Sequence, residues 1–519
     1  MSTASRVVKN TAFLYIKMVI TILVSLISTR LILQSLGASD FGIFTIVGGA
    51  IGMLNFLNYT MANATQRFMS YSEGEGCDGK KIAVFNMSMI LHILIALLTA
   101  LVFAIAFFPL FNGILNIEAS RLFAAKVVYS CLVVSSLFTI VNVPYDAIMN
   151  AHENMLYYSI VGVIESFLKL GVAIACVYAS CDKLILYGVL MACIPILTLS
   201  VMKGYCHKHY SECRYAFRSS FDTTLIKEIA LYSGWNFLTA ISNLLSGQGI
   251  GIVLNHFFGT ALNAAHGIAQ QVNAQLCAFA QNMRKALNPV IVKSAGAKDV
   301  RTMNYAAQMG CKYSTLLTAF FAVPLILEMP YVLELWLKSV PDWAILFCRL
   351  QLLQSLITQS AGSLETSIYA EGRIKKYAIW KSLMNVLPIF ITYLSFRMGG
   401  GPFWLYVPMI IIWGVGGDLV ILHFAKANCS QPVLGWVKIV LLPLIEVILP
   451  MFAVGFLVIF LVPSSFIRLI VCCLMTSITM LACMWLFGLG EQEKNSIGMF
   501  LTKKNKTIYA ESKCDNSRI

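Results

Sequence analysis

Residues 83–109 read AVFNMSMILHILIALLTALVFAIAFFP and contain no Asp, Glu, Lys or Arg. A helix needs about 20 apolar residues to cross the hydrocarbon core of a bilayer, so this stretch predicts a membrane-spanning helix. The whole chain is similar: of 519 residues, 58% are hydrophobic and 12% are charged, and the mean hydropathy is +0.77. Because soluble proteins carry about twice this share of charge, a soluble enzyme with a single anchor is excluded.

Apolar segments of this kind recur fourteen times along the chain, at 11–36, 41–63, 83–109, 122–148, 155–179, 183–206, 226–258, 261–283, 310–329, 343–370, 376–397, 403–425, 436–462 and 466–489. Their length indicates helices, since barrel strands are about 10 residues long and alternate in polarity. Backbone groups in lipid must also be paired within their own segment. The sequence therefore predicts an all-α polytopic membrane protein with about fourteen transmembrane helices.

A weak internal repeat divides these segments. The second span of each half is rich in amides and ends in an Arg that is followed by a basic loop. The spacing from Arg67 to Asn86 is similar to the spacing from Arg284 to Asn304. Paired halves around a central site are a common transporter plan. We expect two six-helix lobes related by pseudo-symmetry, followed by two extra helices. The predicted parts are an N-terminal lobe at 1–206, a cytoplasmic linker at 207–225, a C-terminal lobe at 226–425, the extra pair at 436–489 and a basic tail at 490–519.

The basic residues predict the orientation of the chain. With a cytoplasmic N-terminus, 28 Lys and Arg residues fall on the cytoplasmic side, against five on the other side, namely Arg121, Lys183, Lys338, Arg397 and Arg468. Such a bias is typical of cytoplasmic loops. We therefore expect both termini, and the polar stretches 63–82, 207–225 and 284–309, in the cytoplasm. The net charge of +14 then reflects membrane topology, and no nucleic-acid partner is predicted.

Several charged residues fall within the spans, where they are costly unless they face an interior or a cavity. Lys17, Arg30 and Arg349 have no acid at helical spacing, so they either pair across helices or face a bound anion. Glu165 and Lys169 are four residues apart, which predicts a structural ion pair on one helix face.

Polar side chains also form stripes at helical spacing on the second and eighth spans, and these stripes are candidates for substrate binding: Asn55, Asn58 and Arg67, and Asn263, His266, Gln270, Asn273 and Arg284. A stripe of this kind is either a set of interhelical hydrogen bonds or the wall of a wet cavity. Because the stripes occupy matching places in the two halves, we favour the cavity.

Other chemistry finds little support. Cys206, His207, His209 and Cys213 match no usual zinc spacing, so no metal site is predicted. The chain has no GxxxxGK phosphate loop and no nucleophile–base arrangement. We therefore expect neither an enzyme nor a cofactor.

Residues 29–44, TRLILQSLGASDFGIF, carry a recognisable motif. The pattern Arg-x-Leu…Leu-Gly-x-x-x-Phe-Gly, with Arg30, Gly37, Asp40, Phe41 and Gly42, resembles the first helix and loop of bacterial polysaccharide flippases. That family includes O-antigen and capsule-repeat flippases. It belongs to the superfamily of multidrug, oligosaccharidyl-lipid and polysaccharide exporters.

The resemblance implies a flippase in the bacterial cytoplasmic (inner) membrane that moves an undecaprenyl-diphosphate-linked oligosaccharide outward by alternating access. It would serve the synthesis of a surface polysaccharide such as the O-antigen of lipopolysaccharide. Its partners would be the lipid-linked oligosaccharide, the bilayer, the polysaccharide polymerase machinery and a coupling ion. Two alternatives remain: a multidrug or organic-cation antiporter of the same fold, which needs buried carboxylates, and a non-transporting scaffold of an envelope-assembly complex, which needs no polar stripes.

Overall fold

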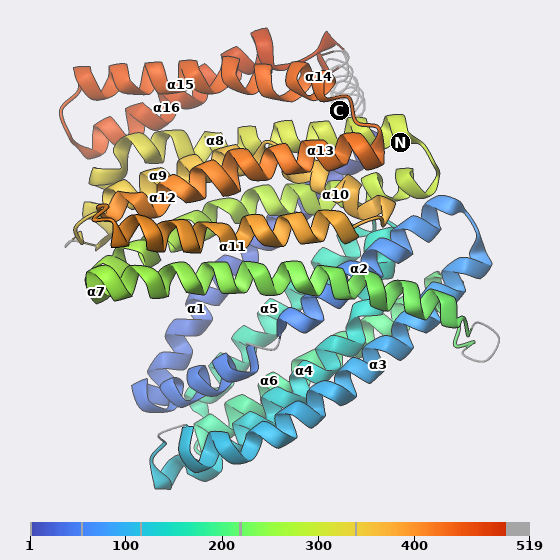
Figure 1. The fold of residues 1–519 in the computed structure, drawn as a ribbon. Coiled ribbons are helices and arrows are strands. Elements are labelled where there is room, and N and C mark those ends of the chain that lie inside the picture. The colour runs from blue at the N-terminus through green and yellow to red at the C-terminus, as the bar shows by residue number, and fades with distance from the viewer. Residues whose placement is uncertain are drawn as a thin grey trace, which may run out of the picture.

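The computed structural model describes residues 3–52, 55–114, 117–216, 221–337, 340–491 and 493–494. Within these ranges the chain is mostly helical and contains no strand (Figure 1). Eleven helical segments are long and apolar enough to cross a membrane. These findings confirm the predicted fold class, an all-α polytopic membrane protein.

The first half of the chain forms six helices: α1 (Thr3–Gly52), α2 (Asn55–Glu75), α3 (Asp78–Pro109), α4 (Leu122–Ala151), α5 (Met155–Tyr178) and α6 (Lys183–His209). Helix α1 bends at Gly37, where φ is 77° and ψ is 170°. This backbone conformation is open essentially only to glycine. The predicted span 41–63 is therefore divided between the last part of α1 and the first part of α2.

The second half begins with α7 (Thr223–Gly296), which bends at Gly259, where φ is 79° and ψ is −173°. The remaining helices are α8 (Val300–Leu337), α9 (Ala344–Gln359), α10 (Gly362–Glu371), α11 (Lys375–Arg397), α12 (Tyr406–Pro408), α13 (Gly417–Cys429), α14 (Val433–Trp436), α15 (Leu442–Leu461) and α16 (Phe466–Cys483). Short π-helical turns join α12 to α13 and α14 to α15, so each of these pairs forms one span.

The eleven apolar segments correspond to fourteen spans once the bends are considered. The 74 residues of α7 hold two spans that meet at Gly259. Two further spans are interrupted helices, one shared by α1 and α2 and one by α9 and α10. Gly37 and Gly259 therefore join the first two spans of each half by the same kind of bend.

Two polar stretches that we expected to be loops are mostly helical. Helix α2 continues to Glu75, and α7 continues to Gly296, only a few residues before α8 begins. The reason is that their polar side chains meet other parts of the protein, while residues such as Val290 and Ile291 on the same helix are buried. The loop in the stretch 284–309 shortens to residues 297–299.

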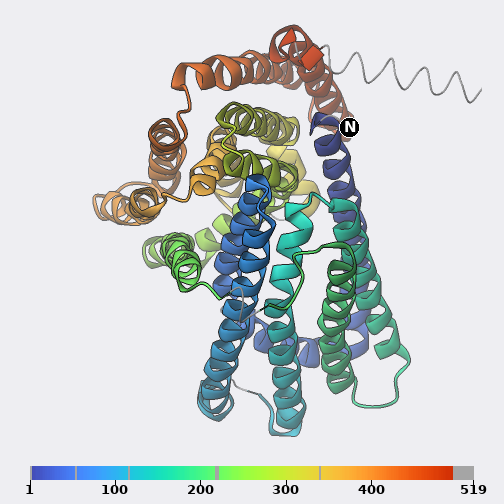
Figure 2. The same ribbon diagram turned by 90° about the vertical axis from the view of Figure 1, so that its right-hand side faces the viewer.

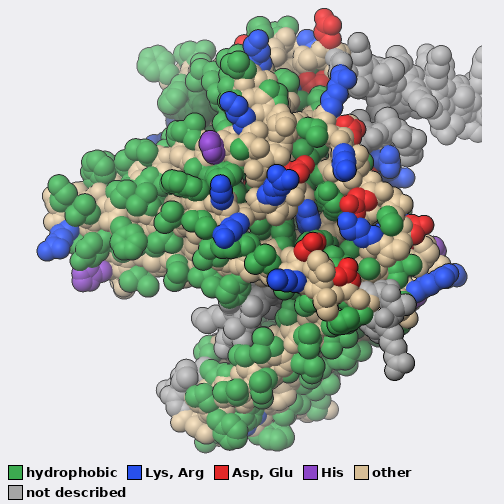
Figure 3. Space-filling view, turned by 45° about the vertical axis from the view of Figure 1, so that its right-hand side comes forward, with side chains coloured by type: hydrophobic (Ala, Val, Ile, Leu, Met, Phe, Trp, Pro, Cys, Tyr) green, Lys and Arg blue, Asp and Glu red, His purple; other side chains and the backbone are tan. Residues whose placement is uncertain are grey.

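Helices α1–α6 form one group, and α7–α13 form a second group beside it (Figures 1 and 2). In Figure 1 the groups meet at the right and diverge toward the left. Helices α15 and α16 pack together against α8, on the outside of the second group. Lys and Arg side chains gather toward the end where the groups meet, and much of the remaining surface is hydrophobic (Figure 3). We call these ends the closed end and the open end.

Candidate functional site

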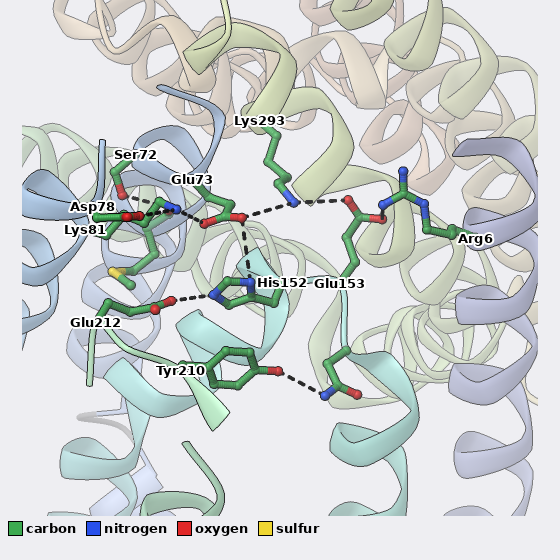
Figure 4. A network of polar contacts seen from close by, with 12 residues as sticks. Arg6, Ser72, Glu73, Asp78, Lys81, His152, Glu153, Tyr210, Glu212 and Lys293 are labelled. Carbon is green, nitrogen blue, oxygen red and sulfur yellow. Dashed lines mark hydrogen bonds and ion pairs between the residues drawn. The ribbon is translucent and has the colours of Figure 1, made fainter. Parts of the chain in front are cut away.

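A network of charged side chains joins the two groups at the closed end (Figure 4). We call it the latch network, and its members are Arg6, Glu73, Lys81, His152, Glu153, Glu212 and Lys293. Lys293 on α7 is its link to the second group, with its Nζ 3.5 Å from a carboxylate oxygen of Glu153 and 3.9 Å from one of Glu73. Glu73 also pairs with Lys81 at 2.8 Å. The side chain of Glu153 is only 8% exposed, so its pairing with Lys293 is shielded from water.

Backbone contact at two glycines accompanies this network. A Cβ atom on Gly74 of α2 would lie 2.0 Å from the carbonyl oxygen of Lys293, and one on Gly296 of α7 would lie 2.1 Å from that of Tyr71. The two glycines occupy matching places near the ends of the second and eighth spans. Only residues without a side chain allow α2 and α7 to cross this closely.

Glu212, in the segment between α6 and α7, anchors the edge of the latch network. Burial opposes its ionisation, but the hydrogen bond with His152, a backbone N–H and the nearby charges outweigh burial, so the pKa of Glu212 lies below its ordinary value. Glu73, His152 and Glu212 also place one potential metal-ligand atom each within 4.8 Å of one another. Because Lys81 and Lys293 already neutralise Glu73, we assign no metal there.

Deeper between the groups, two lysines meet over one aromatic ring. Lys17 of α1 and Lys285 of α7 place their Nζ atoms 4.0 and 4.4 Å from the ring centroid of Tyr158 on α5. Lys285 also donates a hydrogen bond to the Tyr158 hydroxyl at 2.8 Å. We call Lys17 and Lys285 the lysine pair.

The lysine pair lines a cavity of about 180 Å³, together with Asn282, Thr21 and apolar residues of α1. Lys17 packs so closely on α5 that a Cβ atom at Gly162 would lie 2.2 Å from its Cε. Asp146 of α4, a partly exposed residue, lies within electrostatic range of both lysines and accepts a hydrogen bond from Asn142 at 3.2 Å. The site thus combines two cations, one acid, an aromatic face and amides.

A polar face of α7 leads from this cavity toward the open end. Gln271, Gln275, Asn282 and Lys285 are spaced by four, seven and three residues, so they share one side of the helix. Gln271 and Gln275 are exposed, whereas Asn282 contacts the sulfur of Met18 on α1. The contacts of Asn282 with α1 and of Lys285 with α5 turn this part of the helix toward the first group.

The stripe predicted on the eighth span lies largely on another face of α7. His266 is buried and its Nδ1 lies 2.9 Å from the hydroxyl of Tyr406. Asn273 accepts a hydrogen bond from Ser355 of α9 at 2.5 Å. Gln270 lies 3.4 Å from His266.

The two ends of this predicted stripe are also packed against protein. Asn263 lies against Gly251, where a Cβ atom would be 3.4 Å from its Oδ1, and Arg284 lies against Gly362 at the start of α10. These contacts are interhelical packing within the second group.

Arg67 and Arg349 both bond to backbone carbonyl groups. Arg67 donates to the carbonyl oxygen of Ala370 from two nitrogens, at 3.0 and 2.6 Å. Arg349 donates to the carbonyl oxygen of Ile326 at 2.8 Å. That oxygen lacks its usual helical donor because Pro330, four residues on, has no N–H.

The remaining candidates are dispersed. Arg30 is exposed on α1, and it forms no hydrogen bond or ion pair within the described ranges. The side chains of Asn55 and Asn58, at the start of α2, lie outside the described residues, as does most of the tail 490–519. Glu165 and Lys169 lie 2.7 Å apart as an ion pair.

The family-like motif has a structural place at the open end. Gly37 provides the bend in α1, and Asp40 pairs with Arg121. Arg121 in turn donates to Asp182 at 2.8 Å, so the loops after the first, third and fifth spans are tied together. Phe41 packs into a small apolar cluster with Ile32, and a Cβ atom at Gly42 would meet nothing within 4 Å.

Sequence reasoning did not single out Lys285 and Tyr158. Lys285 was assigned to a loop, because the apolar segment ends two residues earlier. Its spacing from Gln271 and Asn282 was the available signal, since a polar face that continues past an apolar segment indicates that the helix continues too. Tyr158 offered no signal, because its role depends on which helices lie beside it.

Comparisons with known proteins support the fold. No family model matches the sequence, and no curated protein matches it. Among solved structures, a MATE transporter in its straight conformation is similar over 82% of this chain and 96% of its own, with a TM-score of 0.70 and 15% identity.

Two further structures cover 82% of this chain and 95% of their own. One is an outward-facing multidrug resistance MATE transporter of the MOP superfamily (TM-score 0.70, 14% identity). The other is a MOP superfamily transporter from Pyrococcus furiosus with a binding pocket of reversed polarity (TM-score 0.66, 13% identity). The chain therefore has the fold of MATE transporters of the MOP superfamily and is a multi-pass membrane protein.

Proposed function

We propose that the protein is a flippase that moves an undecaprenyl-diphosphate-linked oligosaccharide across the bacterial inner membrane. Residues 1–206 and 226–425 act as two lobes that rock about a central site by alternating access. The product would feed the synthesis of a cell-surface polysaccharide. The single observation that carries this proposal is the lysine pair.

The charge of the central site favours an anion. Lys17 and Lys285 line the cavity, and none of its described lining residues is acidic. Asp146 lies within electrostatic range of both lysines, and Glu165, which also acts on Asp146, is paired with Lys169. The lining of the cavity therefore carries a positive charge. A diphosphate is a strong partner for lysine ammonium groups, because hydrogen bonds between ionised partners are about twice as strong as neutral ones. The amides of Gln271 and Gln275 would meet the sugar.

The basic residues favour a cytoplasmic closed end, since Lys and Arg concentrate in cytoplasmic loops. In that orientation both termini would be cytoplasmic, and the central site would be open to the outside. The latch network and the two glycine contacts would have to separate before substrate could enter from the cytoplasm.

The test is a binding measurement on the purified full chain. Lys17→Gln and Lys285→Gln should each bind undecaprenyl diphosphate at least about tenfold more weakly than the wild type does. The reason is that each variant loses a charged hydrogen bond. Lys169→Gln is the matched control, since it removes the same charge from α5 outside the cavity. Equal binding by all three variants and the wild type would reject the lysine pair as a diphosphate site.

Two carboxylates of the second group, one buried and one partly exposed, favour a second candidate, a cation-coupled multidrug antiporter. Asp418 of α13 is buried and accepts a hydrogen bond from Ser360 at 2.7 Å, and Glu365 of α10 accepts one from Tyr377 at 2.6 Å. A fluorescent organic cation serves as the probe. Saturable binding of this cation that depends on Asp418, without binding of undecaprenyl diphosphate, would favour the antiporter.

A further inference from the structure

A second cavity lies at the closed end, apart from the lysine pair. It has a volume of about 640 Å³ and is lined by residues of α2, the first turns of α7, the connection from α10 to α11, and α13. We call it the α7–α11 pocket. Nothing in the proposed transport step uses it.

Four basic side chains line this pocket, against two acids, Glu228 and Glu371. Arg67 is already occupied, because it bonds to Ala370 and its guanidinium stacks 4.6 Å from the ring of Phe68. The other three, Arg373, Lys375 and Lys376, are exposed. Within the described part of the chain, none of these three forms an ion pair.

The pocket wall adds further donors. Helix α11 begins at Lys375, and the residue before it, Ile374, provides no side-chain cap. The first amide groups of a helix lack partners within it, and the positive end of the helix dipole attracts anions. At this cavity wall the first amide groups of α11 lie beside three cations without ion-pair partners. Such a combination of groups binds a phosphate.

The rest of the wall is aromatic and apolar. Trp235 lies across the pocket, with the Nζ of Lys375 5.6 Å from its ring. Leu231, one turn before Trp235 on the same face of α7, is 59% exposed, and Leu238, one turn after it, is 39% exposed. Ile379 continues the face of Lys375 along α11 and is also 39% exposed. The pocket therefore passes from a cationic wall to apolar helix surfaces that acyl chains could follow.

We infer that the α7–α11 pocket binds the phosphate group of a phosphate ester, either a phospholipid headgroup or a soluble phosphate compound. Arg67 of the first group lies against Gly372 of the second within this pocket, where a Cβ atom would be 2.6 Å from the guanidinium. A bound phosphate would therefore lie on the second group, beside its contact with Arg67 of the first group. This inference holds whichever substrate the central site carries.

The test uses the full chain purified in detergent, with phosphatidylglycerol and inorganic phosphate as probes and native mass spectrometry as the readout. The pocket variant carries Arg373→Gln, Lys375→Gln and Lys376→Gln. The control variant removes three other exposed basic groups, with Lys203→Gln, Lys208→Gln and Arg301→Gln. We expect the pocket variant to bind the probes at least about tenfold more weakly than the wild type. The control variant should bind them as the wild type does.

The two sources of phosphate give different results. Phosphatidylglycerol that binds the pocket and resists competition by millimolar phosphate identifies a lipid site, and effective competition identifies a soluble ligand. Equal binding of both probes by the pocket and control variants overturns the inference. If the triple variant does not fold, Arg373→Gln and Lys376→Gln are measured singly. Binding of both probes at the wild-type level by both single variants also overturns the inference.

Discussion

Replacing Gly74 by alanine should open the closed end without unfolding the protein. The new Cβ atom would lie 2.0 Å from the carbonyl oxygen of Lys293, whereas Cβ atoms essentially never approach within 3.0 Å of another heavy atom. The backbones of α2 and α7 must therefore separate by about 1 Å at this point. Overpacking of this kind costs about 1–3 kcal/mol, which corresponds to a 5- to 150-fold change in a conformational equilibrium.

Hydrogen exchange measures this opening directly. Backbone amides at 68–76 and 290–298 should exchange faster in Gly74→Ala and in Gly296→Ala, while those of α16 keep their protection. Gly79→Ala is the control, because a Cβ atom there would meet nothing within 4 Å. Wild-type protection at 68–76 and 290–298 in both latch variants would refute the idea that these glycines set the closed conformation.

Three further predictions concern stability and pH. Gly259→Ala should lower the free energy of unfolding by about 1–3 kcal/mol, because its backbone conformation is essentially restricted to glycine; thermal unfolding of the purified protein measures this. Arg349→Gln should cost about 1–3 kcal/mol by leaving the Ile326 carbonyl unpaired, with transport per folded molecule unchanged; lost transport at full stability would instead favour a substrate contact. The pKa of Glu212 is lowered in the fold, so its ionised carboxylate stabilises the folded protein above the unfolded pKa of about 4.3. This stabilisation is lost as the pH falls through the folded pKa. Acid should therefore speed hydrogen exchange of the backbone amides at 210–214 more in the wild type than in Glu212→Gln.

The apolar segments predicted the fold because length and composition alone specify a membrane span. They also placed the fourteen spans, two of which are interrupted helices, and the bend at Gly37 lies inside the motif recognised in the sequence. The helical ends of α2 and α7 were missed, since polar residues that face protein resemble loop residues when only the sequence is read.

The candidate site shows where sequence reasoning stops. His266 and Asn273 have the right spacing for a common face, but spacing does not say whether that face meets a neighbouring helix or a cavity. Lys17 was found because it is an isolated charge within a span. Its partner Lys285 comes from the second group of helices, and only the packing of α1, α5 and α7 brings the two together over Tyr158.

The most direct test of the central claim is the distribution of lipid-linked oligosaccharide in cells that lack this protein. The account predicts that an undecaprenyl-diphosphate-linked oligosaccharide accumulates in the inner leaflet of the cytoplasmic membrane. The wild-type gene and the Lys169→Gln variant should restore its transfer, and a variant with both Lys17→Gln and Lys285→Gln should not. An unchanged amount and leaflet distribution of every such lipid in the deletion strain would contradict the account.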